Sequence, residues 1–395
     1  MLEWLIVGGG VHGTHVSRVL RHRLGVADDD LLIVDDAPAP LAAWQRRAEA
    51  CGMDYLRSPQ AHHLGLRSDA LRRFADTVRL DGPAFIDPYQ RPALALFDAH
   101  CRQLITDEPA HLRARERVTR IEPQAGGYRV WGRERSWWSR RVLLAPGPPA
   151  PDRPDWAAGV PHVFDHDFAM PDGDGEGNVA IIGGGITAGQ LALCLIARGR
   201  SVNLVTRRRL RRSDFDANPC YAGPRCLVPF AAADWRQRRR RIQVARHPGT
   251  LPRDVATGLQ RAIRRGALHL HVGSAMGLDD RGVVLADRRT VPADELVVAT
   301  GFTDRLPGSQ LISQLIRELA PPLTPCGFPA PQPDLQWRPG LYVTGRLAEM
   351  ELGPMAGNIR GARLAGERLA AASAELTVSP PVPGRAMADS RLPVV

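Results

Sequence analysis

The sequence predicts an α/β fold of two similar parallel-sheet domains, with the second domain inserted into the first. Two observations lead to this prediction. An apolar run, a glycine-rich turn and a helical pattern at residues 5–13 recur at residues 180–189, and a second apolar run follows each copy. Continuous apolar runs that alternate with helices are typical of buried parallel strands. Each copy therefore predicts a strand–helix–strand unit in a sheet of its own.

The first glycine-rich turn has the G-x-G-x-x-G spacing of a dinucleotide-binding loop. Gly8 permits a tight turn, Gly10 lets a pyrophosphate approach the backbone, and Gly13 lets the helix pack close to the strand. The pyrophosphate would lie at a helix N-terminus, whose free N–H groups and dipole favour anions. Asp35 ends the next apolar run, 22 residues after Gly13, and we prefer it to Asp36 as the acid that binds ribose hydroxyls. Because an acid would repel a 2′-phosphate, this site is predicted to bind FAD or NAD.

The second glycine-rich turn has G-x-G-x-x-A spacing, formed by Gly183, Gly185 and Ala188. No acid ends its partner strand, and Arg207 and Arg208 stand there instead. A guanidinium at that position pairs with a 2′-phosphate, often through two parallel hydrogen bonds. This site is therefore predicted to bind NADPH rather than NADH, with at least one of the two arginines on the phosphate. The alternative is a solvated basic surface, which is the usual role of charged runs.

The two turns divide the chain into segments. A stretch of mixed helix and loop at residues 37–90 interrupts the first domain, and a linker rich in Pro, Gly and Asp precedes the second turn. The polar, Pro-rich tail is predicted to be poorly ordered. The predicted segments are the first domain at 1–160, the inserted domain at 173–301, a return to the first domain at 302–372 and the flexible tail at 373–395.

The composition is that of a globular protein without a membrane span. The chain has 395 residues, of which 44% are apolar and 24% are charged. No stretch of about 18 uncharged apolar residues occurs, so no transmembrane helix is expected. The first predicted strand directly precedes Gly8, which leaves no room for a signal peptide, and the protein is expected to be cytoplasmic.

The net charge of +10 rests on 52 arginines, because the sequence contains no lysine. This absence excludes a lysine Schiff base. A basic balance suits nucleic acid or polyanionic cofactors. Since no groove-reading motif is present and the arginines follow a nucleotide-binding turn, no nucleic-acid partner is predicted. A second arginine run, at 238–241, has no such position and is interpreted as surface.

The six cysteines show no C-x-x-C pair and no spacing typical of zinc ligands. The closest pair, Cys220 and Cys226, is six residues apart and is interpreted as incidental thiols. We therefore expect no metal site and no redox-active disulfide of the thioredoxin-reductase type.

The sequence resembles the two-dinucleotide-binding flavoproteins, and among them the flavin-dependent monooxygenases that N-hydroxylate lysine or ornithine. Trp44 and the pair Gly52-Met53 are similar to a W…GM pattern of that family. The stretch 294–302 is similar to its D-x-x-x-L-A-T-G-Y motif, and residues 352–354 open a C-terminal helix that would point at the flavin ring. The resemblance spans residues 3–370.

This resemblance implies two Rossmann-like dinucleotide-binding domains, an FAD domain with an inserted NADP domain. FAD would occupy the first turn and NADPH the second, and the 37–90 segment would lie near the flavin. The family's F-x-G-x-x-x-H fingerprint is absent before the second turn, and its substrate-contacting N-E-x-F segment keeps only Asn218. Further cofactor contacts are expected from Trp44, Thr300, Gly301 and Gly353.

The implied activity is that of a monooxygenase. NADPH would reduce the flavin, dioxygen would add at C4a, and the hydroperoxide would oxygenate a small amine or sulfur substrate in a dry pocket. The catalytic candidates are Gln60, His62 and His63, in the segment expected near the flavin, and Asn218. An NADPH-dependent reductase without oxygen insertion is the first alternative. A non-catalytic flavin-binding redox sensor is the second.

Overall fold

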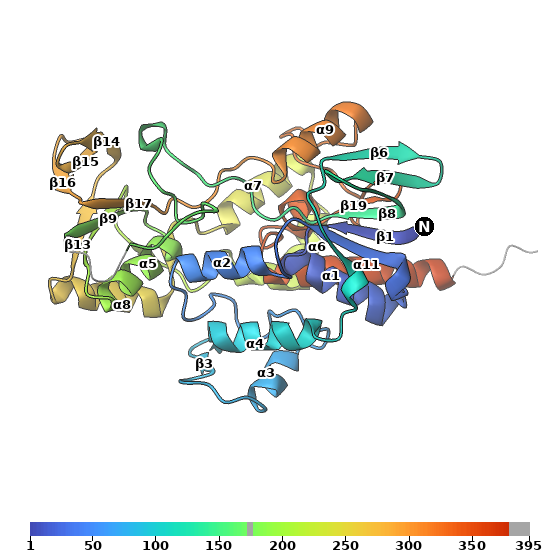
Figure 1. The fold of residues 1–395 in the computed structure, drawn as a ribbon, viewed down its shortest axis with the longest axis horizontal. Coiled ribbons are helices and arrows are strands. Elements are labelled where there is room, and N and C mark those ends of the chain that lie inside the picture. The colour runs from blue at the N-terminus through green and yellow to red at the C-terminus, as the bar shows by residue number, and fades with distance from the viewer. Residues whose placement is uncertain (172–176, 379–395) are drawn as a thin grey trace, which may run out of the picture.

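Figure 1 shows the computed structural model, which describes residues 1–171 and 177–378. Two sheet domains lie side by side, and a small helical lobe lies beneath the first of them in this view. Both sheets contain parallel strands joined by helices, so the predicted α/β class is confirmed. No helix in the described ranges is long and apolar enough to span a membrane.

The first domain is built on an eight-stranded sheet. In spatial order its strands are β18 (Gln336–Arg338), β19 (Leu341–Val343), β8 (Ser136–Leu144), β1 (Leu2–Val7), β2 (Leu31–Asp35) and β5 (Arg113–Arg115), with β7 (Gly127–Trp131) and β6 (Arg120–Gln124) branching from β8. The strands from β19 to β5 are parallel, whereas β7 and β6 form an antiparallel extension. β19 pairs with β8, about 200 residues earlier in the chain, and both are labelled side by side in Figure 1.

The centre of this sheet is buried on both faces. Ile6 of β1 pairs with Ile33 of β2 and with Leu143 of β8, and each of them is at most 1% exposed. Helices α1 (Val11–Leu24) and α11 (Ile359–Val378) pack together under one face, while α9 (Ser309–Leu319) lies against β6 on the other side. Burial on two faces explains why these strands contain runs of consecutive apolar residues instead of alternating apolar and polar ones.

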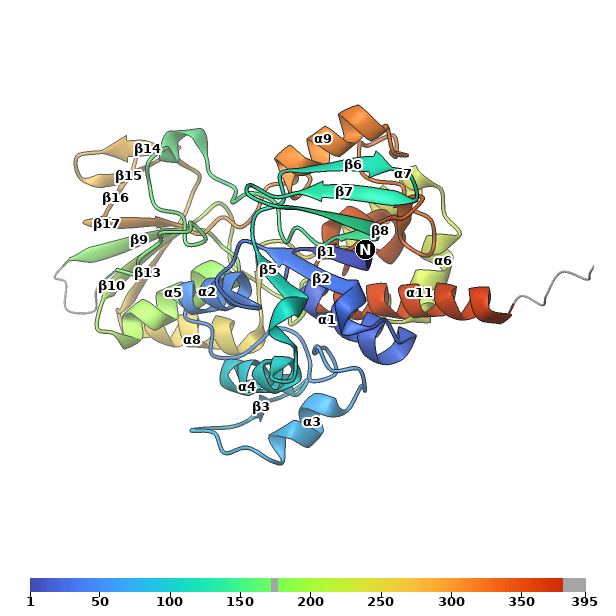
Figure 2. The same cartoon turned by 45° about the vertical axis from the view of Figure 1, so that its right-hand side comes forward.

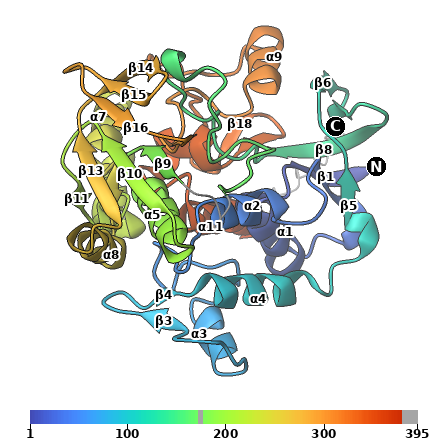
Figure 3. The same ribbon diagram turned by 60° about the vertical axis from the view of Figure 1, so that its left-hand side comes forward.

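The second domain contains a four-stranded parallel sheet, of which β13, β10 and β9 are labelled in Figure 3. Its strands in spatial order are β13 (Leu268–Val272), β10 (Ser201–Thr206), β9 (Asn178–Ile182) and β17 (Glu295–Val298). Helices α5 (Ile186–Ala197) and α8 (Arg253–Arg264) cover one face, and the antiparallel strands β14 (Ala275–Asp279), β15 (Gly282–Leu285) and β16 (Thr290–Pro292) cover the other. The repeated unit of the sequence thus forms β9–α5–β10 here, as it forms β1–α1–β2 in the first domain.

The helical lobe and the remaining connections complete the fold. The lobe, shown at the bottom of Figure 2, holds α3 and α4, and α2 lies between it and the second domain. These elements are α2 (Ala42–Ala50), α3 (Ala70–Ala75), β3 (Phe85–Ile86), β4 (Arg91–Pro92) and α4 (Leu94–Ile105). The other connections contain β11 (Arg211–Arg212), α6 (Pro224–Ala231), α7 (Trp235–Ala245), β12 (Thr250–Leu251) and α10 (Glu349–Leu352), and 3-10 helices at 28–30, 110–112, 155–157, 219–222 and 345–348.

The interpretation of Cys220 and Cys226 as incidental thiols is wrong, because the two residues form a disulfide bond. Cys220 lies in the 3-10 helix 219–222 and Cys226 lies in the first turn of α6. The bend between these two helices brings the thiols together. The spacing of six residues does not reveal this bend.

The interpretation of the arginine run 238–241 as surface is also wrong for half of its members. Arg238 donates to Glu351 at 2.6 Å, and Arg239 donates to Glu349 at the same distance. Both acids belong to α10 of the first domain and are buried. The run therefore joins α7 to the first domain.

The first residues of the predicted flexible tail are helical. Residues 373–378 continue α11, which ends at Val378. The rest of the predicted tail, residues 379–395, lies outside the described residues.

Candidate functional site

A cavity of about 1490 Å³ is lined by both domains and by the lobe. The first domain contributes the glycine turn 8–10 and Asp35, and the second contributes Ile186, Thr187 and Gln190 at the start of α5. Helix α2 contributes a third wall. The first glycine turn and the N-terminal part of α5 therefore line one cavity, whereas Gly183, Gly185 and Ala188 of the second turn do not line it.

The glycines of the first turn differ in the space around them. Gly8 has φ +107°, and a Cβ there would lie 2.2 Å from the carbonyl oxygen of Ala145. A Cβ on Gly13 would lie 1.8 Å from the carbonyl oxygen of Gly8. A Cβ on Gly10 would meet no protein atom within 4 Å, and no side chain caps the helix there. The open space above Gly10 is thus a cradle with free backbone donors, which suits a pyrophosphate.

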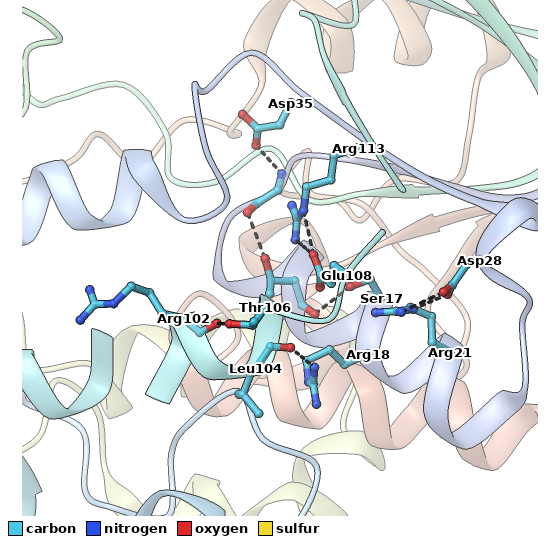
Figure 4. Close-up of polar contacts among 12 residues, drawn as sticks. Ser17, Arg18, Arg21, Asp28, Asp35, Arg102, Leu104, Thr106, Glu108 and Arg113 are labelled. Atoms are coloured by element: carbon cyan, nitrogen blue, oxygen red, sulfur yellow. Dashed lines mark hydrogen bonds and ion pairs between the residues drawn. The ribbon is translucent and has the colours of Figure 1, made fainter. Parts of the chain in front are cut away.

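Asp35 holds the first turn in place. Its carboxylate accepts hydrogen bonds from the backbone N–H of Gly9 and from that of Ala37, the latter at 2.7 Å. Figure 4 shows the carboxylate pointing at the turn, with Arg113 close by. Asp36, the competing acid, forms an ion pair with Arg117 at the surface. Of the two acids, Asp35 is the one that is bound to the glycine turn.

The second turn repeats this geometry at the start of α5. A Cβ on Gly183 would lie 2.4 Å from the carbonyl oxygen of Ala299, and the methyl group of Ala188 already lies 3.0 Å from the same position. No side chain caps α5 at Gly185. Arg207 and Arg208 follow β10 as exposed residues that do not line the cavity, and neither forms an ion pair within the described ranges. Both guanidinium groups are free to bind an anion at the edge of this site.

Of the histidine candidates, His62 lines the cavity and His63 does not. Burial lowers the pKa of His62 to about 4, helped by the charges of Arg360 and Arg363, so its imidazole is neutral near pH 7. His63 is fully buried, and its Nδ1 accepts from the N–H of Gly65 at 3.1 Å. Its Nε2 therefore donates to the carbonyl oxygen of Ser68, at 3.0 Å. These bonds assign His63 to the packing of the lobe.

The other two catalytic candidates lie outside the cavity lining. Asn218 is exposed, and its Oδ1 caps the 3-10 helix by accepting from the N–H of Cys220 at 3.0 Å. The preceding residues Phe215 and Asp216 line the cavity in its place. Gln60 is half-buried, and its Oε1 has no hydrogen-bond partner in the described chain.

Of the remaining predicted cofactor contacts, one lines the cavity and three do not. Trp44 lines the cavity and packs against Phe97, with the ring centres 5.0 Å apart. Thr300 and Gly301 do not line the cavity. The Thr300 hydroxyl donates to the carbonyl oxygen of Asp152, and the N–H of Asp152 donates to the carbonyl oxygen of Gly301 at 2.9 Å. Gly353 faces α6, because a Cβ there would lie 3.3 Å from Leu227. Their neighbours Phe302, Met355, Gly357 and Asn358 line the cavity instead.

Two arginines that sequence analysis missed connect the lobe to the second domain. Arg57 donates to the carbonyl oxygens of Ser213 and Phe215, at 2.7 and 2.8 Å. Arg91, which is 2% exposed, forms an ion pair with Asp254 at 2.5 Å. These contacts hold the two predicted nucleotide sites at one relative position. Their partners lie more than 150 residues away in the chain, so no local pattern indicates them.

The wall of the cavity carries more than one arginine without a counter-ion among the described residues. Within residues 1–171 and 177–378, no group of three or more His, Cys, Asp or Glu side chains is arranged to hold a metal ion. Three cationic side chains of the cavity wall, Arg46, Arg47 and Arg115, form no ion pair with any described residue. The cavity is therefore suited to an anionic ligand such as a dinucleotide.

We compared the chain with known proteins by sequence and by structure. No protein-family model and no curated protein matches the sequence. Among solved structures, the ornithine hydroxylase of Pseudomonas aeruginosa is similar, with 16% identity, a TM-score of 0.75 and coverage of 95% of this chain and 99% of that one. At such identity the likeness shows a shared fold, and the fold expected from the resemblance is confirmed.

Two further solved structures share this fold. The ornithine N-hydroxylase of Kutzneria sp. 744, solved with reduced FAD, NADP⁺ and L-ornithine, has 16% identity and a TM-score of 0.72, over 95% of this chain and 100% of that one. The bacillithiol disulfide reductase of Bacillus cereus has 15% identity and a TM-score of 0.60, over 95% and 99% of the two chains.

Proposed function

We propose that this protein is an FAD- and NADPH-dependent monooxygenase that oxygenates a small nucleophilic substrate, most consistently an amine. The observation that carries the proposal is the single cavity lined by both the first glycine turn and the N-terminus of α5. A shared cavity lets two dinucleotides bring their reactive rings together. The ornithine hydroxylases of the same fold support the amine as substrate.

The residues of the first site fit FAD. The open cradle above Gly10 would take the pyrophosphate, since a larger residue there would fill the space. Asp35 at the end of β2 would hydrogen-bond the adenosine ribose. Trp44, which forms part of the cavity wall, would pack against the bound flavin nucleotide.

The residues of the second site fit NADPH. The uncapped N-terminus of α5 would bind its pyrophosphate. Arg207 and Arg208, exposed and without ion pairs in the described chain, would bind its 2′-phosphate. A carboxylate at the end of β10 would have opposed that phosphate, and none is present.

Once bound, the two cofactors supply the redox chemistry of oxygen insertion. The side chains of the chain orient the substrate and limit the access of water. Phe302 lines the cavity and stacks on Phe164, with the ring centres 4.9 Å apart, which makes this wall apolar. The neutral imidazole of His62 can accept a hydrogen bond from a substrate amine without repelling an ammonium group.

The proposal is tested with the purified protein, NADPH, air and a panel of ornithine, lysine and 1,4-diaminobutane. We expect a yellow protein that is bleached by NADPH without oxygen, and a hydroxylamine product formed with at least one amine in air. A His62→Asn variant should lose product more strongly than a His111→Asn control, because His111 is exposed and paired with Asp29. A colourless protein that takes up no flavin would refute the proposal.

A reductase without oxygen insertion is the second candidate, and the similarity to a bacillithiol disulfide reductase favours it. This activity would consume NADPH under nitrogen when a small disulfide is added. Stoichiometric hydrogen peroxide in air, with no product from any amine, would then replace the monooxygenase proposal by this one.

A further inference from the structure

Helix α2 runs from the first nucleotide site to the second domain. At its start, the N–H of Leu41 donates to the carbonyl oxygen of Gly9 at 3.2 Å. At its end, the Cys51 thiol lies 3.6 Å from Oε1 of Gln190, and a Cβ on Gly52 would lie 2.5 Å from that of Cys194. Both of these partners belong to α5, and Figures 1 and 3 show α2 beside α5. Side chains on α2 can therefore reach either site.

Arg47, in the middle of α2, lacks a counter-ion. It lines the cavity, forms no ion pair with a described residue, and its Nε is buried without a hydrogen-bond partner in the described chain. Burial, and then the neighbouring charge of Arg46, lower the pKa of its guanidinium. Among the other arginines of the cavity wall, Arg117 is paired with Asp36, whereas Arg46 and Arg115 form no ion pair with a described residue. A half-buried cation beside a second cation is unfavourable unless an anion joins it.

Helical geometry indicates which part of α5 Arg47 approaches. Residues four apart lie on one face of a helix, so Arg47 is one turn before Cys51 on the face that meets α5. One turn before Gln190, the contact of Cys51, is Ile186 at the N-terminus of α5. Arg47, Ile186 and Gln190 all line the cavity. The N-terminus of α5 is itself a positive dipole end, so the two groups together attract an anion.

We propose that Arg47 extends from the FAD domain across the cavity and binds the pyrophosphate of the nicotinamide dinucleotide. The inference rests on the proposed function, which places NADPH at α5. It gives Arg47 a role that differs from that of Arg207 and Arg208, because a pyrophosphate ligand is common to all dinucleotides whereas the 2′-phosphate is specific to NADP. A residue of one domain would thus complete the nucleotide site of the other.

The test compares ligands with and without a pyrophosphate on the FAD-loaded protein. NADP⁺ carries both a pyrophosphate and a 2′-phosphate, whereas 2′-AMP carries only the 2′-phosphate. In Arg47→Gln we expect the Kd of NADP⁺ to rise about tenfold or more, as for a lost hydrogen bond between charged groups, and that of 2′-AMP to stay unchanged. Titration calorimetry gives both constants without turnover. Arg47→Lys should restore part of the affinity, since it keeps the charge.

Two controls separate this role from a general effect. Arg240→Gln removes an exposed arginine of α7 that does not line the cavity and should leave both constants unchanged. Arg207→Gln combined with Arg208→Gln should weaken NADP⁺ and 2′-AMP alike. Flavin content should be the same in every variant, because the first site is not altered.

Three results would overturn the inference. Unchanged NADP⁺ binding in Arg47→Gln would show that the residue binds no part of it. Equal losses for NADP⁺ and 2′-AMP would assign Arg47 to the 2′-phosphate, and lost flavin with intact NADP⁺ binding would assign it to FAD. The proposed function fails separately, when the FAD-loaded wild-type protein binds no NADP⁺ at all.

Discussion

The substitution Gly10→Ala separates a ligand cradle from a structural turn. The added Cβ would meet no protein atom within 4 Å, and Gly10 has φ −75°, which alanine adopts freely. Alanine is a weaker helix N-cap than glycine, so the free energy of unfolding of the flavin-free protein should fall by no more than about 1 kcal/mol. The folded structure should therefore tolerate the change.

Flavin binding should not tolerate it. If a pyrophosphate occupies the cradle, the methyl group has to displace it, and overpacking of that kind costs about 1–3 kcal/mol. The Kd of FAD should rise roughly 5- to 150-fold, because about 1.4 kcal/mol corresponds to a factor of ten. The assay is fluorescence titration of the flavin-free protein with FAD, paired with thermal unfolding of the same sample.

Two other glycines provide the comparison. A Cβ on Gly277 of β14 also meets nothing within 4 Å, so Gly277→Ala should change neither Tm nor FAD affinity. Gly13→Ala should lower the Tm of the flavin-free protein, because its Cβ would lie 1.8 Å from the carbonyl oxygen of Gly8. Full FAD affinity in Gly10→Ala would refute the assignment of this space to a pyrophosphate.

Three more predictions follow from the same structure. Arg207→Ala combined with Arg208→Ala should raise KM for NADPH far more than KM for NADH, as measured by steady-state kinetics. The lost binding free energy of NADPH should be on the order of 1–3 kcal/mol. Glu349→Gln should lower the free energy of unfolding by about 3–5 kcal/mol in denaturant titration, because this fully buried carboxylate is the partner of three arginines. Burial lowers the pKa of His63 from 6.5 to about 4, so the folded state resists protonation of this imidazole. The free energy of unfolding should therefore fall as the pH drops from 6.5 toward 4, by roughly 3 kcal/mol for this residue.

Each of these predictions has a result that would contradict it. An unchanged preference for NADPH would remove both arginines from the 2′-phosphate site. A Glu349→Gln protein as stable as wild type would show that the three arginines find other partners. A His63→Gln variant with the same pH dependence of unfolding as wild type would assign that dependence to other buried groups, such as His15, whose pKa burial lowers to about 3.

The predicted fold could be derived from the sequence because its signals are local. A Cβ on Gly13 would collide with the carbonyl oxygen of Gly8 in the same strand–helix unit. A Cβ on Gly8 would collide with the carbonyl oxygen of Ala145, which follows the neighbouring strand. The apolar runs of β1, β2, β9 and β10 report burial on two faces, which any neighbouring layer produces. Asp35 ends its strand next to the turn that it binds. Apart from Gly8, whose close contact comes from Ala145 after β8, the physical requirement acts within one β–α–β unit.

The composition of the site depended on contacts that no local pattern contains. Arg238 and Arg239 have the pattern of a solvent-exposed charged run, yet they form ion pairs with acids more than 100 residues later in the chain. Asn218 caps a helix, while Asp216 beside it lines the cavity. A charged or polar side chain can be hydrated at any exposed position, so the sequence alone does not indicate its contacts. Its role is decided by the partner that the fold brings next to it.

The sequence by itself determined two β–α–β units with glycine turns and the charge at the end of each partner strand, because backbone sterics and burial act over short stretches of chain. Only the tertiary structure decided that the first glycine turn and the N-terminal part of α5 line one cavity, and that Arg47 faces this cavity without a counter-ion. These features arise where separate units pack together, and the free energy of such packing depends on side chains that are distant in the chain.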